Sequence, residues 1–167
     1  NFAVEMERTL GFRAQVINVG GGRGIEYVRG AQPAGLEPWM QEIAQALRES
    51  LPPTWPLPKL VIEPGRSLIG DAGVTLYRVG VRKERPSGPL LIVDGGLSDN
   101  PRPIMYGGTY LVENLTRSSD QKATFLVAGS HCETDTLFDG VDLPIDSQAG
   151  DLLQVLGTGA YNAAMAS

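Results

Sequence analysis

The charged turn Glu63-Pro64-Gly65-Arg66 directly follows a short apolar run at 59–62. Proline and glycine fix the turn, so one carboxylate and one guanidinium point beyond the end of the expected strand. A guanidinium binds a carboxylate or a phosphate through paired hydrogen bonds. The turn therefore predicts an anion site, although a salt bridge that closes the loop explains the same residues equally well.

A glycine-rich run, Gly20-Gly21-Gly22, begins a second candidate loop, which continues through Arg23 and Gly24. Glycine lets the backbone approach a phosphate closely, and the loop amides then donate hydrogen bonds to it. The spacing matches neither the P-loop nor the dinucleotide-binding glycine motif. The run predicts either a phosphate-binding loop or a simple tight turn.

The sole histidine and the sole cysteine of the chain, His131 and Cys132, are adjacent, and Glu133 follows them. A lone cysteine is most often a small buried hydrophobe, but the polar neighbours here are less typical of a core thiol. A thiol with a pKa near 8.5 is able to donate a proton as a general acid. Adjacent residues of a strand point to opposite faces, so no Cys–His nucleophile pair is predicted. No metal site is predicted either, because a second histidine or cysteine is lacking.

Two more loops contain groups that bind anions. The stretch 94–107 includes Arg102 and Tyr106 among glycines and prolines, and its alternative interpretation is an ordinary surface loop. Tyr161 follows the glycines of 157–159, where its hydroxyl either reaches an anion or its ring packs at a helix start.

The elements around these loops change in kind along the chain. Residues 14–19 and 59–62 read as strands, and apolar residues at helical spacing over 36–51 predict an amphipathic helix between them. A strand–helix–strand unit implies a parallel sheet. Further strands are expected at 74–83, 90–93, 123–128 and 151–156, without a long helix among them. We expect a boundary near residue 74, with an α/β part at 1–74 and a β-rich part at 75–167.

Composition excludes several classes of protein. The 167 residues are 42% hydrophobic with a net charge of −5, which excludes a disordered tail and gives no footprint for nucleic acid or anionic lipid. The apolar runs are too short to span a membrane. The chain starts at an asparagine within helix-compatible sequence and ends within another such run, so we expect a piece of a larger chain.

The order of these motifs resembles the diaminopimelate decarboxylases, which are pyridoxal-phosphate enzymes of the alanine racemase/ornithine decarboxylase fold type. The resemblance covers nearly the whole chain. The motifs that carry it are Gly20 to Gly24, Glu63-Pro64-Gly65-Arg66-Ser67, Asp94 to Pro103 (D-G-G-L-S-D-N-P-R-P) with Tyr106-Gly107, His131-Cys132-Glu133, and Gly159 to Ser167 (G-A-Y-N-A-A-M-A-S).

The resemblance implies a fold and an activity. The fold would be the last βα units of a pyridoxal-phosphate-binding TIM-type barrel followed by a mostly antiparallel β domain. The activity would be decarboxylation of meso-2,6-diaminopimelate to L-lysine and carbon dioxide in a cytoplasmic homodimer with shared active sites. Two alternatives are a related decarboxylase of arginine or ornithine and a non-catalytic scaffold that binds a phosphate compound.

The resemblance also implies residue roles. The cofactor phosphate would be bound by backbone amides of the glycine run and lie near Gly65, Arg66 and Tyr161, while Glu63 would pair with the pyridine nitrogen. The positions that match substrate-binding residues are Arg66, Arg102, Tyr106, Glu133 and Tyr161. Cys132 and Glu133 match a pair that serves the neighbouring subunit's site, with Cys132 near the reacting carbon and Glu133 toward the distal amine.

Two departures from the family pattern bear on these roles. The lysine that carries the cofactor belongs to the N-terminal half of the barrel, and Lys59, Lys83 and Lys122 match none of its contexts. We therefore expect this polypeptide alone to be inactive. The acid that follows the cysteine is displaced by one position, to Asp135, which leaves its role open.

Overall fold

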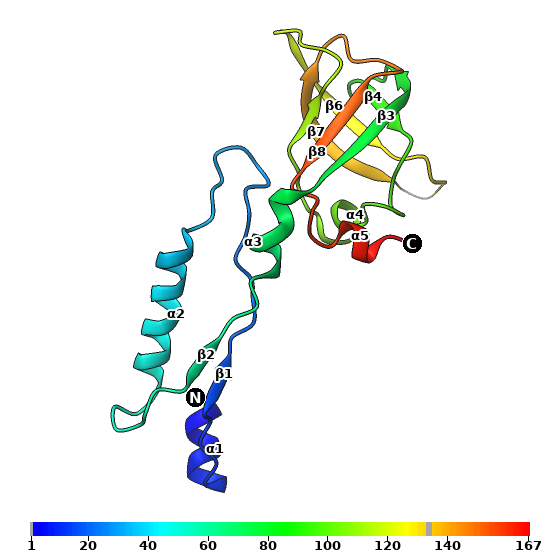
Figure 1. The fold of residues 1–167 in the computed structure, drawn as a ribbon. Helices are drawn as coiled ribbons and strands as arrows, with labels where there is room; N and C mark the ends of the chain where they lie inside the picture. The colour runs from blue at the N-terminus through cyan, green and yellow to red at the C-terminus, as the bar shows by residue number, and fades with distance from the viewer. Residues whose placement is uncertain (1, 133–134) are drawn as a thin grey trace. The chain divides into compact units, whose positions relative to one another are not determined.

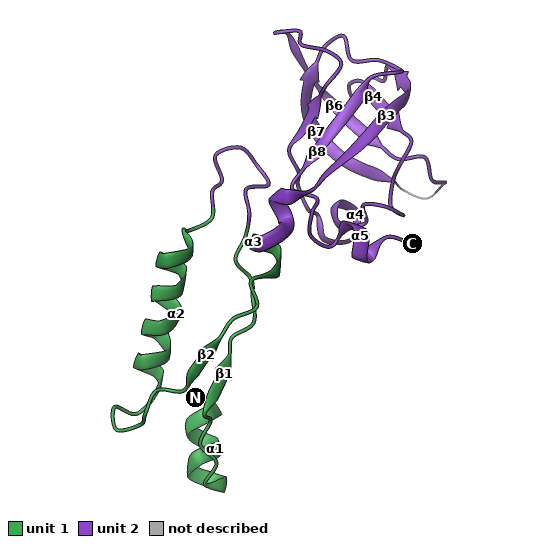
Figure 2. Cartoon of the chain, viewed as in Figure 1, with its two compact units in different colours: residues 1–24, 33–67 green, residues 25–32, 68–167 purple. Residues whose placement is uncertain are grey.

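The computed structural model describes residues 2–132 and 135–167 and divides the chain into two compact units (Figure 2). Unit 1 comprises Asn1–Gly24 and Pro33–Ser67, and unit 2 comprises Ile25–Gln32 and Leu68–Ser167. In the described part of the chain, no helix is long and apolar enough to cross a membrane.

Unit 1 is built on a parallel pair of short strands, β1 (Val16–Asn18) and β2 (Lys59–Val61). They are connected through α2 (Leu36–Ser50), and α1 (Phe2–Leu10) precedes them. The expected strand–helix–strand unit is confirmed. The helix ends before Pro52 and Pro53, because neither proline can donate a helical hydrogen bond.

Figure 1 shows the sheet of unit 2 with most of its strands labelled. The sheet has six strands in the order β5-β8-β3-β4-β6-β7. Its strands are β3 (Val74–Lys83), β4 (Leu90–Val93), β5 (Val112–Asn114), β6 (Lys122–Ala128), β7 (Thr136–Pro144) and β8 (Leu152–Leu156). All described neighbours in this sheet pair antiparallel except β4 and β6. The mostly antiparallel β part is confirmed, and β5 and β7 are strands that the sequence did not predict.

Alternation of apolar and polar residues along the strands builds the core of unit 2. Tyr77 and Val79 of β3, Leu91 and Val93 of β4, and Phe125 of β6 are almost completely buried in one cluster. Each of these pairs is two residues apart, which places its members on the same face of the sheet. One face of the curved sheet therefore holds the core.

The parallel pair β4–β6 determines where two loops leave the sheet. Leu90 pairs with Leu126 and Ile92 with Ala128, so both strands end at the same edge. The loop after β4 leads into α4 (Arg102–Tyr106), and the loop after β6 contains Cys132. A backbone hydrogen bond from Ser130 N to Gly95 O at 2.9 Å joins the two loops.

Short helices complete both units. The helix α3 (Gly65–Ile69) directly follows the Glu63 turn, and the 3-10 helix η1 (Gly70–Ala72) leads into β3. The helix α5 (Asn162–Met165) follows β8.

Candidate functional site

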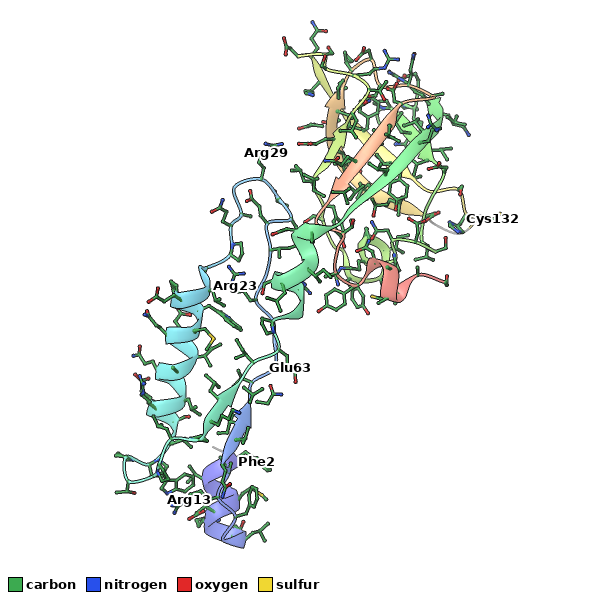
Figure 3. All side chains as sticks on the ribbon, viewed as in Figure 1. Phe2, Arg13, Arg23, Arg29, Glu63 and Cys132 are labelled. Atoms are coloured by element: carbon green, nitrogen blue, oxygen red, sulfur yellow. The ribbon has the colours of Figure 1, made fainter. Side chains whose placement is uncertain are left out.

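In unit 1 the glycine run and Glu63 follow the two paired strands and lie against each other. The ladder continues past β1 and β2, since Val19 N donates to Val61 O at 3.1 Å and Glu63 N donates to Gly20 O at 2.7 Å. The Glu63 carboxylate accepts a hydrogen bond from Asn18 Nδ2 at 2.6 Å. Figure 3 shows Glu63 just beyond β2. The strand ends thus bring together two motifs that lie about forty residues apart.

The backbone of Gly20 to Gly22 has a conformation that requires glycine. Gly20 and Gly22 have φ angles of 74° and 102°, and a Cβ on Gly21 would overlap the carbonyl oxygen of Glu63. Gly20 N donates to Asn18 Oδ1 at 2.8 Å, whereas the amides of Gly21 and Gly22 donate to no described residue. The loop therefore has two backbone N–H groups without a described acceptor, which is compatible with a phosphate-binding loop.

Gly65 and Arg66 are the first two residues of α3. Gly65 N donates to Glu63 O at 2.9 Å, and the Ser67 hydroxyl donates to Pro64 O at 2.9 Å. These bonds close the turn around Pro64, and Arg66 lies within it. The structure thereby places Arg66 in the same turn as Glu63, as the motif predicts.

In unit 2 the guanidinium of Arg102 contacts two tyrosine rings. Its Cζ atom is 5.8 Å from the centre of the Tyr106 ring and 5.1 Å from the centre of the Tyr161 ring. Its Nε donates to the hydroxyl of Tyr110 at 3.0 Å. The terminal nitrogens Nη1 and Nη2 donate to no described residue. The structure thus brings Tyr161 to Arg102 and Tyr106, which lie in a different loop of the sequence.

Tyr161 has a backbone conformation that is unusual for its residue type. Its φ of 72° is the only positive value among the described non-glycine residues, and its side chain is 43% exposed. The segment before it is held by two backbone bonds, Thr158 N to Gly73 O at 3.1 Å and Gly159 N to Gly70 O at 2.9 Å. Strained backbone of this kind concentrates at functional sites and persists only where surrounding bonds enforce it.

Tyr110 is a member of this cluster that the sequence analysis missed. It precedes β5, its residue is 8% exposed, and its ring contacts Tyr27 and Phe138 edge to face. A tyrosine among apolar residues resembles a core residue in sequence. Only the spatial position of its hydroxyl, against Arg102, connects it to the candidate site.

Cys132 is exposed, on the loop between β6 and β7 (Figure 3). An exposed thiol agrees with its polar neighbours in the sequence, which are less typical of a core cysteine. Glu133, the predicted partner of Cys132, lies outside the described residues.

Asp135 anchors the Cys132 loop. Its side chain is 3% exposed and accepts hydrogen bonds from His131 N at 3.1 Å and from Leu97 N at 2.8 Å. The same carboxylate lies 2.6 Å from Nδ1 of His131. Asp135 therefore connects the Cys132 loop to the loop that leads to Arg102, although it is displaced by one position from the family pattern.

A pair formed by a carboxylate and a tyrosine hydroxyl supports the loop after β4. The Tyr77 hydroxyl donates to Asp99 Oδ2, and Asp99 Oδ1 accepts from Gly96 N at 2.7 Å. Burial raises the pKa of the Tyr77 hydroxyl above its ordinary value of 10.0, and the bond to the Asp99 carboxylate raises it further. Tyr77 therefore stays protonated and acts as a structural donor.

A comparison with protein families gives a match that includes these loops. Residues 14–159 match the family described as pyridoxal-dependent decarboxylase, C-terminal sheet domain. The chain belongs to the pyridoxal-dependent decarboxylases. The match spans both units, so it includes the strand–helix–strand unit as well as the six-stranded sheet, and it confirms the expected fold class and the pyridoxal dependence of the family.

Individual relatives give a more specific similarity than the family as a whole. The chain is 46% identical over 163 residues to a diaminopimelate decarboxylase of Synechocystis sp., covering 95% of this chain and 34% of the relative. The crystal structure of diaminopimelate decarboxylase from M. jannaschii superposes with a TM-score of 0.84 at 30% identity, covering 99% of this chain and 38% of that one. The Helicobacter pylori enzyme complexed with L-lysine gives a TM-score of 0.78 at 28% identity, with coverages of 98% and 39%.

This member of the pyridoxal-dependent decarboxylases spans about a third of the length of the curated relatives that it matches. Its unit 1 has a single parallel strand pair, and α1 and α2 bury no residue. The strand–helix–strand unit here is an open pair of strands and not a closed barrel.

Proposed function

We propose that this chain is the C-terminal part of a diaminopimelate decarboxylase, which converts meso-2,6-diaminopimelate to L-lysine and carbon dioxide. The proposal rests on the Arg102 cluster in a member of this family. The unreacted end of diaminopimelate retains a carboxylate, whereas the distal end of ornithine or arginine is only a cation. A guanidinium whose two terminal nitrogens donate to no described residue therefore favours diaminopimelate.

Pyridoxal phosphate fits the residues of unit 1. The amides of Gly21 and Gly22, which donate to no described residue, suit the phosphate, with Gly65 and Arg66 at its edge. Glu63, which Asn18 orients, holds a proton on the pyridine nitrogen. When bound, the cofactor supplies the electron sink for the carbanion that remains after loss of carbon dioxide.

The remaining groups bind the substrate and deliver the proton. Arg102 and Tyr106 hold the distal carboxylate, and Arg66 and Tyr161 contact both substrate and cofactor phosphate. The Cys132 thiol donates a proton to the reacting carbon, and Glu133 binds the distal ammonium. These last two residues serve the site of the neighbouring subunit in a homodimer.

The two parts of the chain divide this work. Residues 1–74 form the C-terminal part of the cofactor-binding barrel, and residues 75–167 form the β-rich domain that adds the substrate-binding and proton-donating loops. We place the enzyme in the cytoplasm, with an amino acid as its ligand and neither nucleic acid nor membrane as a partner.

An assay of the full-length, cofactor-loaded polypeptide tests the proposal. Diaminopimelate, arginine and ornithine are supplied separately, and carbon dioxide and the amine product are quantified. We expect L-lysine from diaminopimelate and at most trace turnover of the other two. Turnover of arginine or ornithine alone, or of none of the three, would overturn the proposal.

Complementation between subunits tests the shared site. Cys132→Ala is expected to lower turnover by about 100-fold or more, the usual contribution of a general acid, and to leave the cofactor absorbance intact. Mixing this variant with one that lacks the cofactor-carrying lysine is expected to restore measurable activity, because half of the sites in a mixed dimer then have both groups. An absence of restoration would argue for sites contained within one subunit.

A further inference from the structure

The hydroxyl of Tyr110 determines which edge of the Arg102 guanidinium is open to a ligand. Nε of Arg102 donates to that hydroxyl at 3.0 Å. A guanidinium offers a carboxylate two forked edges, one formed by Nε with a terminal nitrogen and one formed by the two terminal nitrogens. Because Tyr110 occupies Nε, the edge between Nη1 and Nη2 remains.

The ring of Tyr110 is fixed by two other parts of unit 2. Tyr27, from the segment 25–32, contacts it with ring centres 5.1 Å apart and an angle of 78° between the planes. Phe138, from β7, contacts it at 6.1 Å and 70°. Edge-to-face contacts of this kind favour one orientation of the rings. The hydroxyl is therefore held at one place, independently of any ligand.

The arrangement also determines the orientation of Arg102. The tyrosine rings at 106 and 161 contact the guanidinium but allow it to slide, since a cation over a ring has little directional preference. The Nε–hydroxyl bond is directional, so it removes that freedom. A guanidinium oriented before binding loses less entropy when a carboxylate arrives.

We propose that Tyr110 is a positioning residue that orients Arg102, so that the edge between its terminal nitrogens receives the distal carboxylate of the substrate. This inference rests on the proposed function, because it assumes that the ligand of Arg102 is that carboxylate. Tyr110 itself touches neither substrate nor cofactor in this assignment.

The test uses the full-length holoenzyme and two ligands that differ in the carboxylate. L-Lysine retains it, whereas 1,5-diaminopentane lacks it, and calorimetry gives the dissociation constant of each. Tyr110→Phe removes the hydroxyl and preserves the ring contacts. We expect it to weaken L-lysine binding about tenfold, change diaminopentane binding less than twofold, and raise KM for diaminopimelate with a smaller change in kcat.

Two further variants make the test specific. In an Arg102→Ala background, Tyr110→Phe is expected to cause no additional loss of L-lysine affinity, because the group that it orients is gone. Thr124→Val removes a hydroxyl that donates to Asp142 across β6 and β7 at 2.7 Å. This control variant is expected to leave the dissociation constants of both ligands unchanged. Phe138→Leu loosens the packing of the Tyr110 ring while keeping its hydroxyl. It should weaken the binding of L-lysine by about threefold without weakening the binding of diaminopentane.

Three outcomes would overturn the inference. The first is an unchanged affinity for L-lysine in a folded Tyr110→Phe enzyme. The second is an equal loss of affinity for both ligands, and the third is a full additional loss of L-lysine affinity when Tyr110→Phe is made in the Arg102→Ala background. If Tyr110→Phe fails to fold, Phe138→Leu gives the same comparison. Failure of the proposed function would look different, since the wild-type enzyme would then not turn over diaminopimelate.

Discussion

Asn162 donates a hydrogen bond from Nδ2 to Oδ1 of Asn100 at 2.7 Å, and both residues are almost completely buried. Asn100 lies in the loop after β4, two residues before Arg102, and Asn162 follows Tyr161 directly. The amide pair therefore joins the two segments whose side chains meet at Arg102. A backbone bond from Ser167 N to Ser98 O at 2.9 Å supports the same junction.

Removing one member of the pair should destabilise the sheet domain. Asn162→Ala leaves the carbonyl of Asn100 buried without its donor, which costs about 1–3 kcal/mol of unfolding free energy. The double variant Asn100→Ala/Asn162→Ala should cost less than the sum of the single variants by about 1 kcal/mol. Urea unfolding of the three variants measures both quantities, and strict additivity would show that the two amides do not interact.

Asp135 should determine the stability of the Cys132 loop. Asp135→Ala removes a buried acceptor from Leu97 N and from His131, at a cost of about 3 kcal/mol, and should lower turnover. Asp135→Asn preserves one acceptor oxygen, so its stability is expected to lie between that of the alanine variant and that of the wild type. Hydrogen exchange at the Leu97 amide reports the loss directly. Unchanged protection of that amide in the alanine variant would contradict the role.

Much of the fold was predictable because its strands follow simple patterns. The strands at 74–83 and 90–93 and the helix from 36 matched their predicted positions, since periodicity alone specifies them. β5 has only three residues, one of them Glu113, and β7 contains Gly140 in a left-handed conformation. Pairing with longer neighbours, rather than a local pattern, makes these two segments strands.

The candidate site was predictable to a similar extent. Arg102, Tyr106 and Tyr161 were identified by residue type and by their place after a strand, and the structure brings them together. Tyr110 was missed because its role depends on Tyr27 and Phe138, which are remote in sequence. Asp135 acts through backbone amides, and no sequence motif records which amides a carboxylate will meet.

The left-handed backbone at Tyr161 should separate stability from activity. Glycine tolerates a φ of 72°, whereas any residue with a Cβ is strained there. Tyr161→Gly is therefore expected to be about 1 kcal/mol more stable than Tyr161→Ala in urea unfolding. Both variants lose the ring beside Arg102, so both should bind L-lysine more weakly. Equal stability of the two would show that the strain is absorbed elsewhere.

Acid sensitivity of the sheet domain should depend on Asp151. Burial tends to raise the pKa of its carboxyl, but hydrogen bonds from Asn114, Gln148 N and Arg117 outweigh burial and hold the pKa below the ordinary value of 3.8. A depressed pKa contributes stability that is fully present above 3.8 and is lost as the pH falls below it toward the folded-state value.

Asp151→Asn is therefore expected to lower stability at neutral pH and to flatten its decline below pH 3.8. Asp146→Asn is the matched control, because Asp146 contacts the same Arg117 but is far more exposed. Unfolding midpoints between pH 7 and pH 3 would measure both effects. An equal loss of acid sensitivity in the two variants would contradict the assignment to Asp151.

The strand order of unit 2 places β8 inside the sheet. β8 lies between β5 and β3, and both of these strands precede it in the sequence. On the ribosome, β3 and β5 therefore emerge without the neighbour that later separates them, and their edges stay open until residue 156 has left the exit tunnel. Pairing over such a distance in sequence is slow. A stop codon before β8 would consequently release a chain in which β3 has one unpaired edge and β5 lacks its described partner strand, which invites aggregation rather than a smaller folded domain.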